Sequence, residues 1–330
     1  MRYINILAGF VGLVLAAGRT SPPEGALVVA ADGSGKYKTI QDAVDALSSS
    51  SSEQSIFIKP GTYKEQVYVK QLNGPLVIYG HTSDTSSYAG NQVVITGSKS
   101  QKTEANNDAT ATLRVWTSNF KLYNVNVVNT FGKGSQALAL SANAGDQGYY
   151  GCSFKGFQDT VLAQTGAQLY AKSYIEGATD FIFGQNGQAW FDYCDIRVLS
   201  ASVGYITASG RADAANPSHY VLNKCSISAA GGKSVEAGAY FLGRPWGAYA
   251  RVAVQSCTMS NVINAAGWAV WNKGDERTGK VEFGEDGNEG AGASGTRAKF
   301  AKKLDAPVKK ESVLGSGYAS ARWVDKAYLS

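Results

Sequence analysis

Short hydrophobic segments recur along the chain in one pattern. Each begins with a small, apolar or thiol residue, continues with a polar residue and ends with an apolar residue. Six segments follow this pattern: Val125-Asn126-Val127, Cys152-Ser153-Phe154, Ser173-Tyr174-Ile175, Cys194-Asp195-Ile196, Cys225-Ser226-Ile227 and Cys257-Thr258-Met259. Their first residues are separated by 27, 21, 21, 31 and 32 positions. Repeats of this length are typical of a solenoid in which each repeat forms one coil.

The segments within each coil are predicted to be strands rather than helices, because they are short, rich in β-branched and aromatic residues, and separated by Gly, Asn, Asp and Ser. An all-β parallel solenoid follows. Its open end needs a cover, since an exposed sheet edge promotes aggregation. Residues 39–47 predict a short capping helix at the amino-terminal end, with Ile40, Val44 and Leu47 on one face. Residues 297–303 predict a further helical segment near the other end.

The four cysteines all occupy the same position of the repeat, the first residue of a segment. In a secreted chain, four cysteines suggest two disulfides. Cys152 and Cys194 lie two coils apart, however, about 9.5 Å at a strand spacing of about 4.8 Å, which is too far for a bridge. Cys194 and Cys225, or Cys225 and Cys257, lie on adjacent coils at a permitted distance, but their side chains would point in parallel directions rather than toward each other. We therefore expect a buried ladder of free thiols that pack as small hydrophobic groups.

The amino terminus has the features of a secretory signal. Arg2 is followed by an apolar run over residues 4–17, which is too short to span a bilayer and ends in small residues. We expect residues 1–17 to be a signal peptide and residues 18–330 to form one domain, because no linker divides them. The chain is therefore expected to be secreted, and a long solenoid with its own caps is expected to be a monomer.

Composition excludes several kinds of chemistry. The 330 residues carry a net charge of +5, and only 17% of them are charged. His81 and His219 are the only histidines, so a three-histidine metal site cannot form. No nucleic-acid-binding motif accompanies the modest positive charge, and we expect no nucleic-acid or membrane partner. A lysine-rich stretch over residues 299–310 is interpreted as a solvated helix face rather than a polyanion site.

Polar residues also recur at coil spacing. Gln136 precedes Gln158 by 22 positions, and Asp159 precedes Asp180 by 21. On a solenoid these offsets bring two amides and two carboxylates together on neighbouring coils. Two close carboxylates raise one another's pKa, which leaves an acid beside a nucleophile or base. A ladder of turn-forming Asn and Asp residues is the structural alternative, and spacing alone does not separate the two.

Five local motifs favour the functional interpretation. They are GTYKE at 61–65, QALAL at 136–140, QDT at 158–160, DFIFG at 180–184 and LGRPW at 242–246. In sequence and in order, they resemble the pectin methylesterase (pectinesterase) family, and the resemblance extends from about Val28 to the end of the chain. It implies a single-stranded right-handed parallel β-helix that is secreted and needs no cofactor or metal. The implied activity is hydrolysis of methyl esters of homogalacturonan, the substrate expected here.

The resemblance also implies residue roles. Asp180 would be the nucleophile, and Asp159 the acid that protonates departing methanol and then the base that activates water. Gln158 would donate to the oxyanion, and Gln136 would share that role or hold substrate. Arg244 would keep Asp180 ionised.

Aromatic residues near these motifs are expected to bind sugar rings, whose C–H faces are apolar. Trp246 and Trp271 resemble the aromatic platforms of the family, and Phe181 is expected to flank or seal the cleft. Trp268 is expected in the core, and Tyr63 and Glu65 are expected to have structural roles.

Two alternatives remain open at this stage. One is a pectin depolymerase of the same fold, although the Asp-Asp pair, the Gly-His-Gly segment and the acidic calcium cluster of such enzymes do not occur in the sequence. The other is a non-catalytic pectin-binding solenoid in which the tryptophans bind sugar and the aspartates form turns. Methanol release from methylated pectin separates both from an esterase. A serine esterase is disfavoured because no G-x-S-x-G motif is present and no histidine accompanies a candidate serine.

Overall fold

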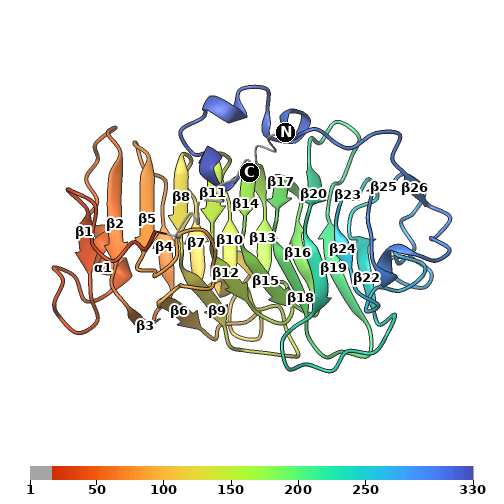
Figure 1. Cartoon of the computed structure of the whole chain (residues 1–330), viewed down its shortest axis with the longest axis horizontal. Helices are drawn as coiled ribbons and strands as arrows, with labels where there is room; N and C mark the ends of the chain where they lie inside the picture. The colour runs from red at the N-terminus through yellow and green to blue at the C-terminus, as the bar shows by residue number, and fades with distance from the viewer. Residues whose placement is uncertain (1–16, 330) are drawn as a thin grey trace, which may run out of the picture.

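The computed structural model describes residues 17–329. Its strands form three long sheets that run side by side along a single axis (Figure 1). Every strand pair within these sheets is parallel, and from β2 to β24 successive strands of the chain visit the three sheets in turn. The fold is therefore a right-handed parallel β-helix, as the repeat pattern and the resemblance predicted. The predicted signal peptide falls almost wholly outside the described residues.

The three sheets differ in length. The 11-stranded sheet contains, in spatial order, β1 (Leu27–Val29), β2 (Gln54–Ile58), β5 (Leu76–Gly80), β8 (Phe120–Tyr123), β11 (Gln147–Tyr150), β14 (Thr165–Ala171), β17 (Asn186–Asp192), β20 (His219–Asn223), β23 (Arg251–Gln255), β25 (Glu282–Asp286) and β26 (Ala301–Lys303). The eight-stranded sheet contains β3 (Gly61–Lys64), β6 (Val93–Gly97), β9 (Asn126–Asn129), β12 (Ser153–Lys155), β15 (Tyr174–Gly177), β18 (Asp195–Val198), β21 (Ser226–Ala229) and β24 (Thr258–Met259). The seven-stranded sheet contains β4 (Val67–Val69), β7 (Leu113–Val115), β10 (Leu140–Ala142), β13 (Val161–Ala163), β16 (Thr179–Gly184), β19 (Gly204–Ser209) and β22 (Tyr240–Pro245).

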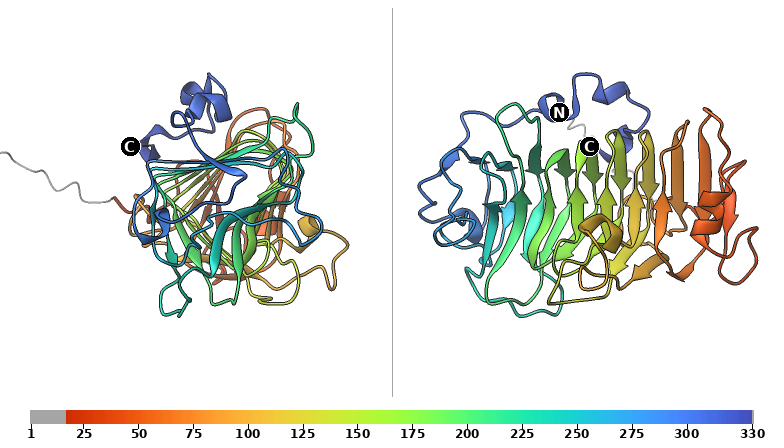
Figure 2. Two further views of the ribbon diagram at one scale, coloured as in Figure 1. Left: turned by 90° about the vertical axis from the view of Figure 1, so that its right-hand side faces the viewer. Right: turned by 180° about the vertical axis from the view of Figure 1, so that it is seen from behind.

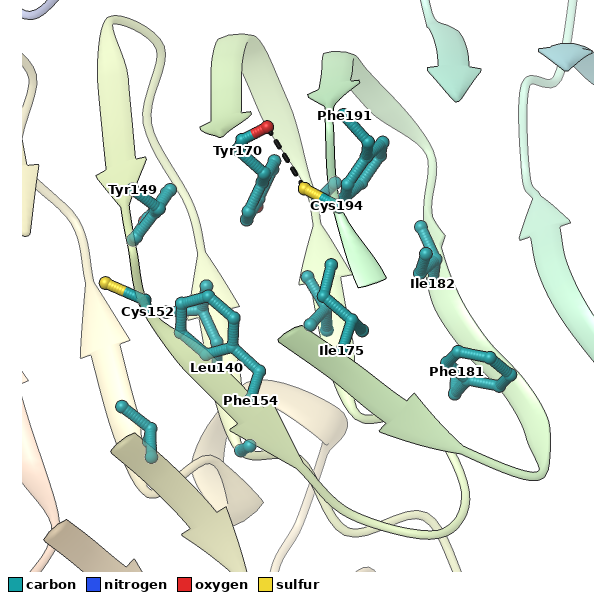
Figure 3. Packing of buried hydrophobic residues seen from close by; sticks show 14 of the residues in the cluster. Leu140, Tyr149, Cys152, Phe154, Tyr170, Ile175, Phe181, Ile182, Phe191 and Cys194 are labelled. Carbon is teal, nitrogen blue, oxygen red and sulfur yellow. Dashed lines mark hydrogen bonds between the residues drawn. The ribbon is translucent and has the colours of Figure 1, made fainter. Parts of the chain in front are cut away.

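The interior of the β-helix is filled by side chains stacked from coil to coil (Figure 3). Tyr149, Tyr170 and Phe191 form one stack, with ring centroids 4.8 and 4.6 Å apart and nearly parallel planes. This separation equals the spacing of neighbouring strands, so each coil contributes one ring at the same level. The stack explains why aromatic residues recur at coil intervals in the sequence.

The cysteine ladder also lies in this interior. Cys152, Cys194, Cys225 and Cys257 are all buried, and none of them forms a disulfide. Their thiols contact backbone carbonyls, and the Sγ of Cys257 accepts a hydrogen bond from the backbone N–H of Cys225 at 3.3 Å. The expectation of buried free thiols is therefore confirmed.

Helix α1 (Ile40–Asp45) lies at the amino-terminal end of the β-helix, next to β1, β2 and β4. The hydroxyl of Thr39 accepts from the backbone N–H of Asp42, and Ile40 and Val44 are buried. The carboxylate of Glu65 accepts from the backbone N–H groups of Ile40 and Gln41, both at 2.9 Å. The capping helix is thus confirmed, although it is shorter than predicted, and Glu65 has the structural role expected for it.

The prediction of a helical segment at residues 297–303 is wrong. Residues Ala301–Lys303 form strand β26, which pairs with β25 and continues the 11-stranded sheet. The free hydrogen-bonding edge of β25 is satisfied in this way, which a helix could not do. Arg297 instead forms a two-point ion pair with Glu285, with both N–O distances at 2.9 Å.

The lysine-rich stretch is consequently not a single helix face, because Lys302 and Lys303 lie on β26. Short helix α3 (Lys310–Leu314) follows, and Lys310 pairs with the fully buried Asp192 at 2.5 Å. The remaining chain returns across the outer face of the 11-stranded sheet (Figure 2). It includes the 3₁₀ turns Tyr318–Ser320 and Lys326–Tyr328, while a third, Ala291–Ala293, precedes β26. No helix among residues 17–329 is long and apolar enough to cross a membrane.

Candidate active site

The seven-stranded sheet carries a cleft on its outer face, and this cleft contains the polar residues that recur at coil spacing. Its volume is about 330 Å³. The residues that line it are Asn107, Gln136, Gln158, Asp159, Asp180, Phe183, Ala208, Arg244, Trp246, Trp271 and Asn272. The structure therefore brings together seven of the eight residues predicted from the sequence.

Backbone pairing between coils explains this convergence. The backbone N–H of Ala137 donates to the carbonyl of Gln158 at 3.2 Å, and the N–H of Asp159 donates to the carbonyl of Thr179 at 3.0 Å. Gln158 and Thr179 are direct partners in a parallel bridge. Three successive coils thus carry these residues at nearly the same level: Gln136 on the first, Gln158 and Asp159 on the second, and Asp180 on the third.

Both aspartates have left-handed backbone conformations, with φ of +62° at Asp159 and +50° at Asp180. Such angles are uncommon for residues other than glycine and are tolerated best by Asn and Asp. The register between β16 and β19 also shifts between Thr179 and Ile182. The strand is therefore locally irregular at Asp180, whose carboxylate lines the cleft.

The same irregularity corrects the expectation for Phe181. This side chain is fully buried and belongs to the core inside the β-helix, so it does not line the cleft (Figure 3). Simple alternation would place Ile182 on the side opposite to Phe181, but the register shift turns both inward. Phe183, which the sequence interpretation missed, is the aromatic residue of this motif that lines the cleft.

Arg244 holds Asp180 through two parallel contacts. Its Nε donates to Oδ1 of Asp180 at 2.9 Å, and its Nη2 donates to Oδ2 at 2.6 Å. The guanidinium lies 4.1 Å from the ring centre of Tyr205 and 4.3 Å from that of Trp271. A planar cation held by aromatic rings and a carboxylate in this way has little freedom to move.

The two carboxyl groups differ in their surroundings. Burial raises the pKa of Asp159 well above its ordinary value, the charge of Asp180 raises it further, and Arg244 opposes this rise. Burial also raises the pKa of Asp180, but the hydrogen bonds and charge of Arg244 directly oppose that rise. Since Asp180 alone contacts the guanidinium, Arg244 favours the ionised form of Asp180 most directly, whereas burial and the neighbouring charge favour the protonated form of Asp159.

Asn107 is a further residue that sequence reasoning missed. It begins the short helix α2 (Asn107–Thr110), and its Nδ2 lies 3.5 Å from Oδ2 of Asp159. No motif marks it, because the helix belongs to a loop far from the aspartates in sequence.

Aromatic residues form one side of the cleft. Trp246 and Trp271 pack against a small apolar cluster on the outer face of the sheet that includes Phe183 and Ala208. Trp268 is instead buried, and its ring stacks on Phe283 with centroids 4.4 Å apart. The expectation that Trp268 is a core residue is confirmed.

Neither histidine lines the cleft. Burial lowers the pKa of His219 to about 3, and neighbouring Arg251 and Arg211 lower it as well, so this imidazole is neutral at ordinary pH. Across residues 17–329, no group of three or more His, Cys, Asp or Glu side chains is placed to hold a metal ion.

A parallel β-helix with a paired carboxyl site in an aromatic-lined surface cleft defines a class of carbohydrate-active hydrolase. Comparison with known proteins specifies the family. The family model described as Pectinesterase matches residues 26–313. The chain is 52% identical over 324 residues to a pectinesterase of Aspergillus aculeatus, covering 97% of each chain. It is 49% identical over 331 residues to a pectinesterase of Aspergillus niger, covering 99% of each.

Solved structures agree with this result. The fold superposes on the pectin methylesterase of Aspergillus niger with a TM-score of 0.88 and 40% identity, covering 94% of this chain and 100% of that one. For the pectin methylesterase from carrot the TM-score is 0.82 at 29% identity, covering 92% and 98% of the two chains. The chain belongs to the pectinesterase family of carboxylic ester hydrolases.

Proposed function

We propose that this chain hydrolyses the methyl esters of homogalacturonan to free galacturonate carboxyl groups and methanol, with Asp180 as nucleophile and Asp159 as acid and base. Family membership supports the reaction. One observation supports the assignment of roles: Arg244 contacts both oxygens of Asp180, whereas Asp159 is buried beside that pair with a raised pKa. The different surroundings of Asp180 and Asp159 thus suit these two identical side chains to different steps of the reaction.

In the first step, the ionised carboxylate of Asp180 attacks the carbonyl carbon of the methyl ester. The carbon–methoxy bond breaks, and the departing methoxy oxygen takes the proton of Asp159, so that methanol leaves and an acyl-enzyme anhydride remains. The left-handed backbone at Asp180 presents its carboxylate into the cleft. Arg244 opposes protonation of the nucleophile before attack.

In the second step, Asp159 is ionised and accepts a proton from a water molecule. The resulting hydroxide attacks the substrate carbonyl of the anhydride, the bond to Asp180 breaks, and the galacturonic acid group is released and loses its proton to solvent. Asp159 regains its proton and Asp180 its charge, so the site returns to its starting state. These steps need only the side chains of the cleft and water.

The tetrahedral intermediate of each step carries a negative oxygen. The side chains of Gln136 and Gln158 lie on the two coils that precede Asp180 and line the same cleft, where their amide N–H groups can donate to that oxygen. Trp246 and Trp271 supply apolar surfaces on which sugar rings can lie.

Secretion and a monomeric state complete the proposal. The apolar run after Arg2 supports removal of residues 1–17 as a signal peptide. Mass spectrometry of the exported protein tests the cleavage position, and light scattering tests the monomer.

The activity is tested by incubating the chain with highly methylated pectin and measuring methanol and polymer size together. Methanol release without shortening of the polymer is expected. Shortening without methanol would identify a depolymerase, and binding without either change would identify a non-catalytic pectin-binding protein. The family match favours the esterase over both alternatives.

A further inference from the structure

The cleft that holds Asp180 continues along the axis of the β-helix. A second depression of about 420 Å³ shares Asn107, Phe183 and Trp246 with it and reaches Trp116. Trp116 follows β7, three strands away from β16, which carries Asp180. At a strand spacing of about 4.8 Å, this displacement along the axis is roughly 14 Å.

Strand register shows how the groove is built. One outward row crosses the seven-stranded sheet through directly paired residues: Arg114, Ser141, Leu162, Phe183, Ala208 and Arg244. The next outward position on each strand forms a second row: Trp116, Asn143, Gln164, Gln185, Gly210 and Trp246. Tryptophans therefore stand at both ends of the second row.

Between these two tryptophans lie three side-chain amides. The Nε2 of Gln164 donates to Oε1 of Gln185 at 3.2 Å, and Asn143 occupies the position on the next coil. Amides both donate and accept hydrogen bonds without carrying charge, which suits the hydroxyl and ester groups of a sugar chain. At Gly210 the ring of Trp246 takes the space of the missing side chain, since a Cβ there would lie 2.5 Å from the ring.

Trp116 is exposed but not free to move. Its side chain is 40% exposed, which is unusual for a large apolar group. Its Nε1 donates to Oδ1 of Asp108 at 3.0 Å, and its ring lies edge-on to Tyr68 with centroids 6.3 Å apart. Asp108 is held in turn by Arg114, at 3.0 and 2.5 Å, and by Ser141 at 2.8 Å.

This arrangement resembles the catalytic end of the groove. Arg114 contacts a carboxylate and lies 4.0 Å from the ring centre of Tyr68, much as Arg244 contacts Asp180 and lies 4.1 Å from Tyr205. At the Trp116 end, however, the carboxylate also accepts the indole N–H. The carboxylate of Asp108 therefore contacts an aromatic ring on one side and the guanidinium of Arg114 on the other.

Helix α2 connects the two ends. Asn107 contacts Asp159, and the next residue, Asp108, contacts Trp116. A sugar chain that lies along the groove would therefore contact two aromatic surfaces whose positions are set by adjacent residues.

We propose that Trp116 is a distal platform for a homogalacturonan chain that runs along the second row from Trp246, and that Asp108 holds it in position. The inference rests on the proposed function. Stacking of one sugar on an exposed aromatic ring contributes about 1 kcal/mol, which corresponds to a change in affinity of roughly 5-fold. Only substrates long enough to reach Trp116 from the reacting ester gain this contribution.

The test compares wild type, Trp116→Ala and Trp116→Phe on esterified oligogalacturonides from dimer to decamer and on pectin. For Trp116→Ala we expect KM to rise about 3- to 10-fold on the long substrates, with kcat within about 2-fold of wild type. KM for the dimer should not change, and Trp116→Phe should retain most of the affinity. Tyr193→Ala is the matched control, because Tyr193 is 39% exposed and lines neither depression.

An unchanged KM on pectin would overturn the proposal. An equal rise in KM on the dimer would also overturn it, because it would show that Trp116 acts only by supporting the catalytic cleft. If wild type released no methanol from any substrate, the proposed function itself would be wrong, which is a different result from either of these.

Discussion

Arg244 contacts both carboxylate oxygens of Asp180, at 2.9 and 2.6 Å, and makes no such contact with Asp159 on the preceding coil. Both carboxyl groups are buried and both have raised pKa values. The position of a single guanidinium therefore favours Asp180 over Asp159 as the anion. Four predictions follow from this site and from the interior that supports it.

Replacing Asp180 by Asn should reduce methanol release by at least about 1,000-fold, because the amide cannot attack the ester. Asn is the suitable replacement since it tolerates the left-handed backbone at this position. Circular dichroism should show an unchanged fold. Asp146→Asn is the control, because Asp146 also has a positive φ, of +59°, but does not line the cleft. Activity near wild type in Asp180→Asn would contradict the assignment of the nucleophile.

Replacing Asp159 by Asn should abolish turnover and also stabilise the protein near neutral pH. The pKa of this carboxyl is raised in the folded state relative to its ordinary value of 3.8. Below a pH of 3.8 the carboxyl group is neutral in both the folded and the unfolded state, so the substitution has little effect on the free energy of unfolding. As the pH rises, ionisation favours the unfolded wild type, so the stability advantage of the variant grows.

Thermal unfolding of both proteins from about pH 3 to about pH 7 measures this difference. Every tenfold change in the proton affinity of Asp159 on folding corresponds to about 1.4 kcal/mol in the free energy of unfolding. A variant that is less stable than wild type at neutral pH would show that the ionised carboxylate makes a favourable contact in the folded protein.

Arg244→Lys should reduce kcat about 100-fold, even though the charge is kept. A lysine ammonium cannot make the two parallel contacts with Asp180 or stack flat between Tyr205 and Trp271. Arg197→Lys is a matched control. The side chain of Arg197 is 18% exposed and that of Arg244 is 15% exposed, and Arg197 pairs with Asp195 away from the cleft, on the eight-stranded sheet. Equal activity in the two variants would show that Arg244 only supports its loop.

The four cysteine thiols should be unreactive in the native protein and all accessible after denaturation. Burial raises the pKa of Cys152 to about 12, so almost no thiolate is present at neutral pH. A thiol reagent applied with and without denaturant measures the difference. Intact mass under non-reducing conditions gives an independent check, because each disulfide would lower the mass by two hydrogens.

Much of the site was predictable because the coil repeat converts sequence spacing into proximity. Gln136, Gln158, Asp159 and Asp180 recur at coil intervals, and the structure places them in one cleft. The buried thiol ladder was predictable for the same reason. Arg244, by contrast, was recognised through its motif, since the spacing between Asp180 and Arg244 does not match a single coil.

Other features depended on contacts between distant segments. A register shift in β16 turned Phe181 inward and left Phe183 in the cleft. Residues 301–303 form a strand because they pair with the free edge of β25.

The sequence by itself determined the coil repeat, the filling of the interior and the convergence of the polar ladder, because parallel strand pairing forces residues one repeat apart to be neighbours. The tertiary structure alone decided which loops cover the outer face of the sheet. It placed Asn107 against Asp159 and Trp116 on Asp108. Those contacts join elements with no common repeat, so no spacing in the sequence could predict them.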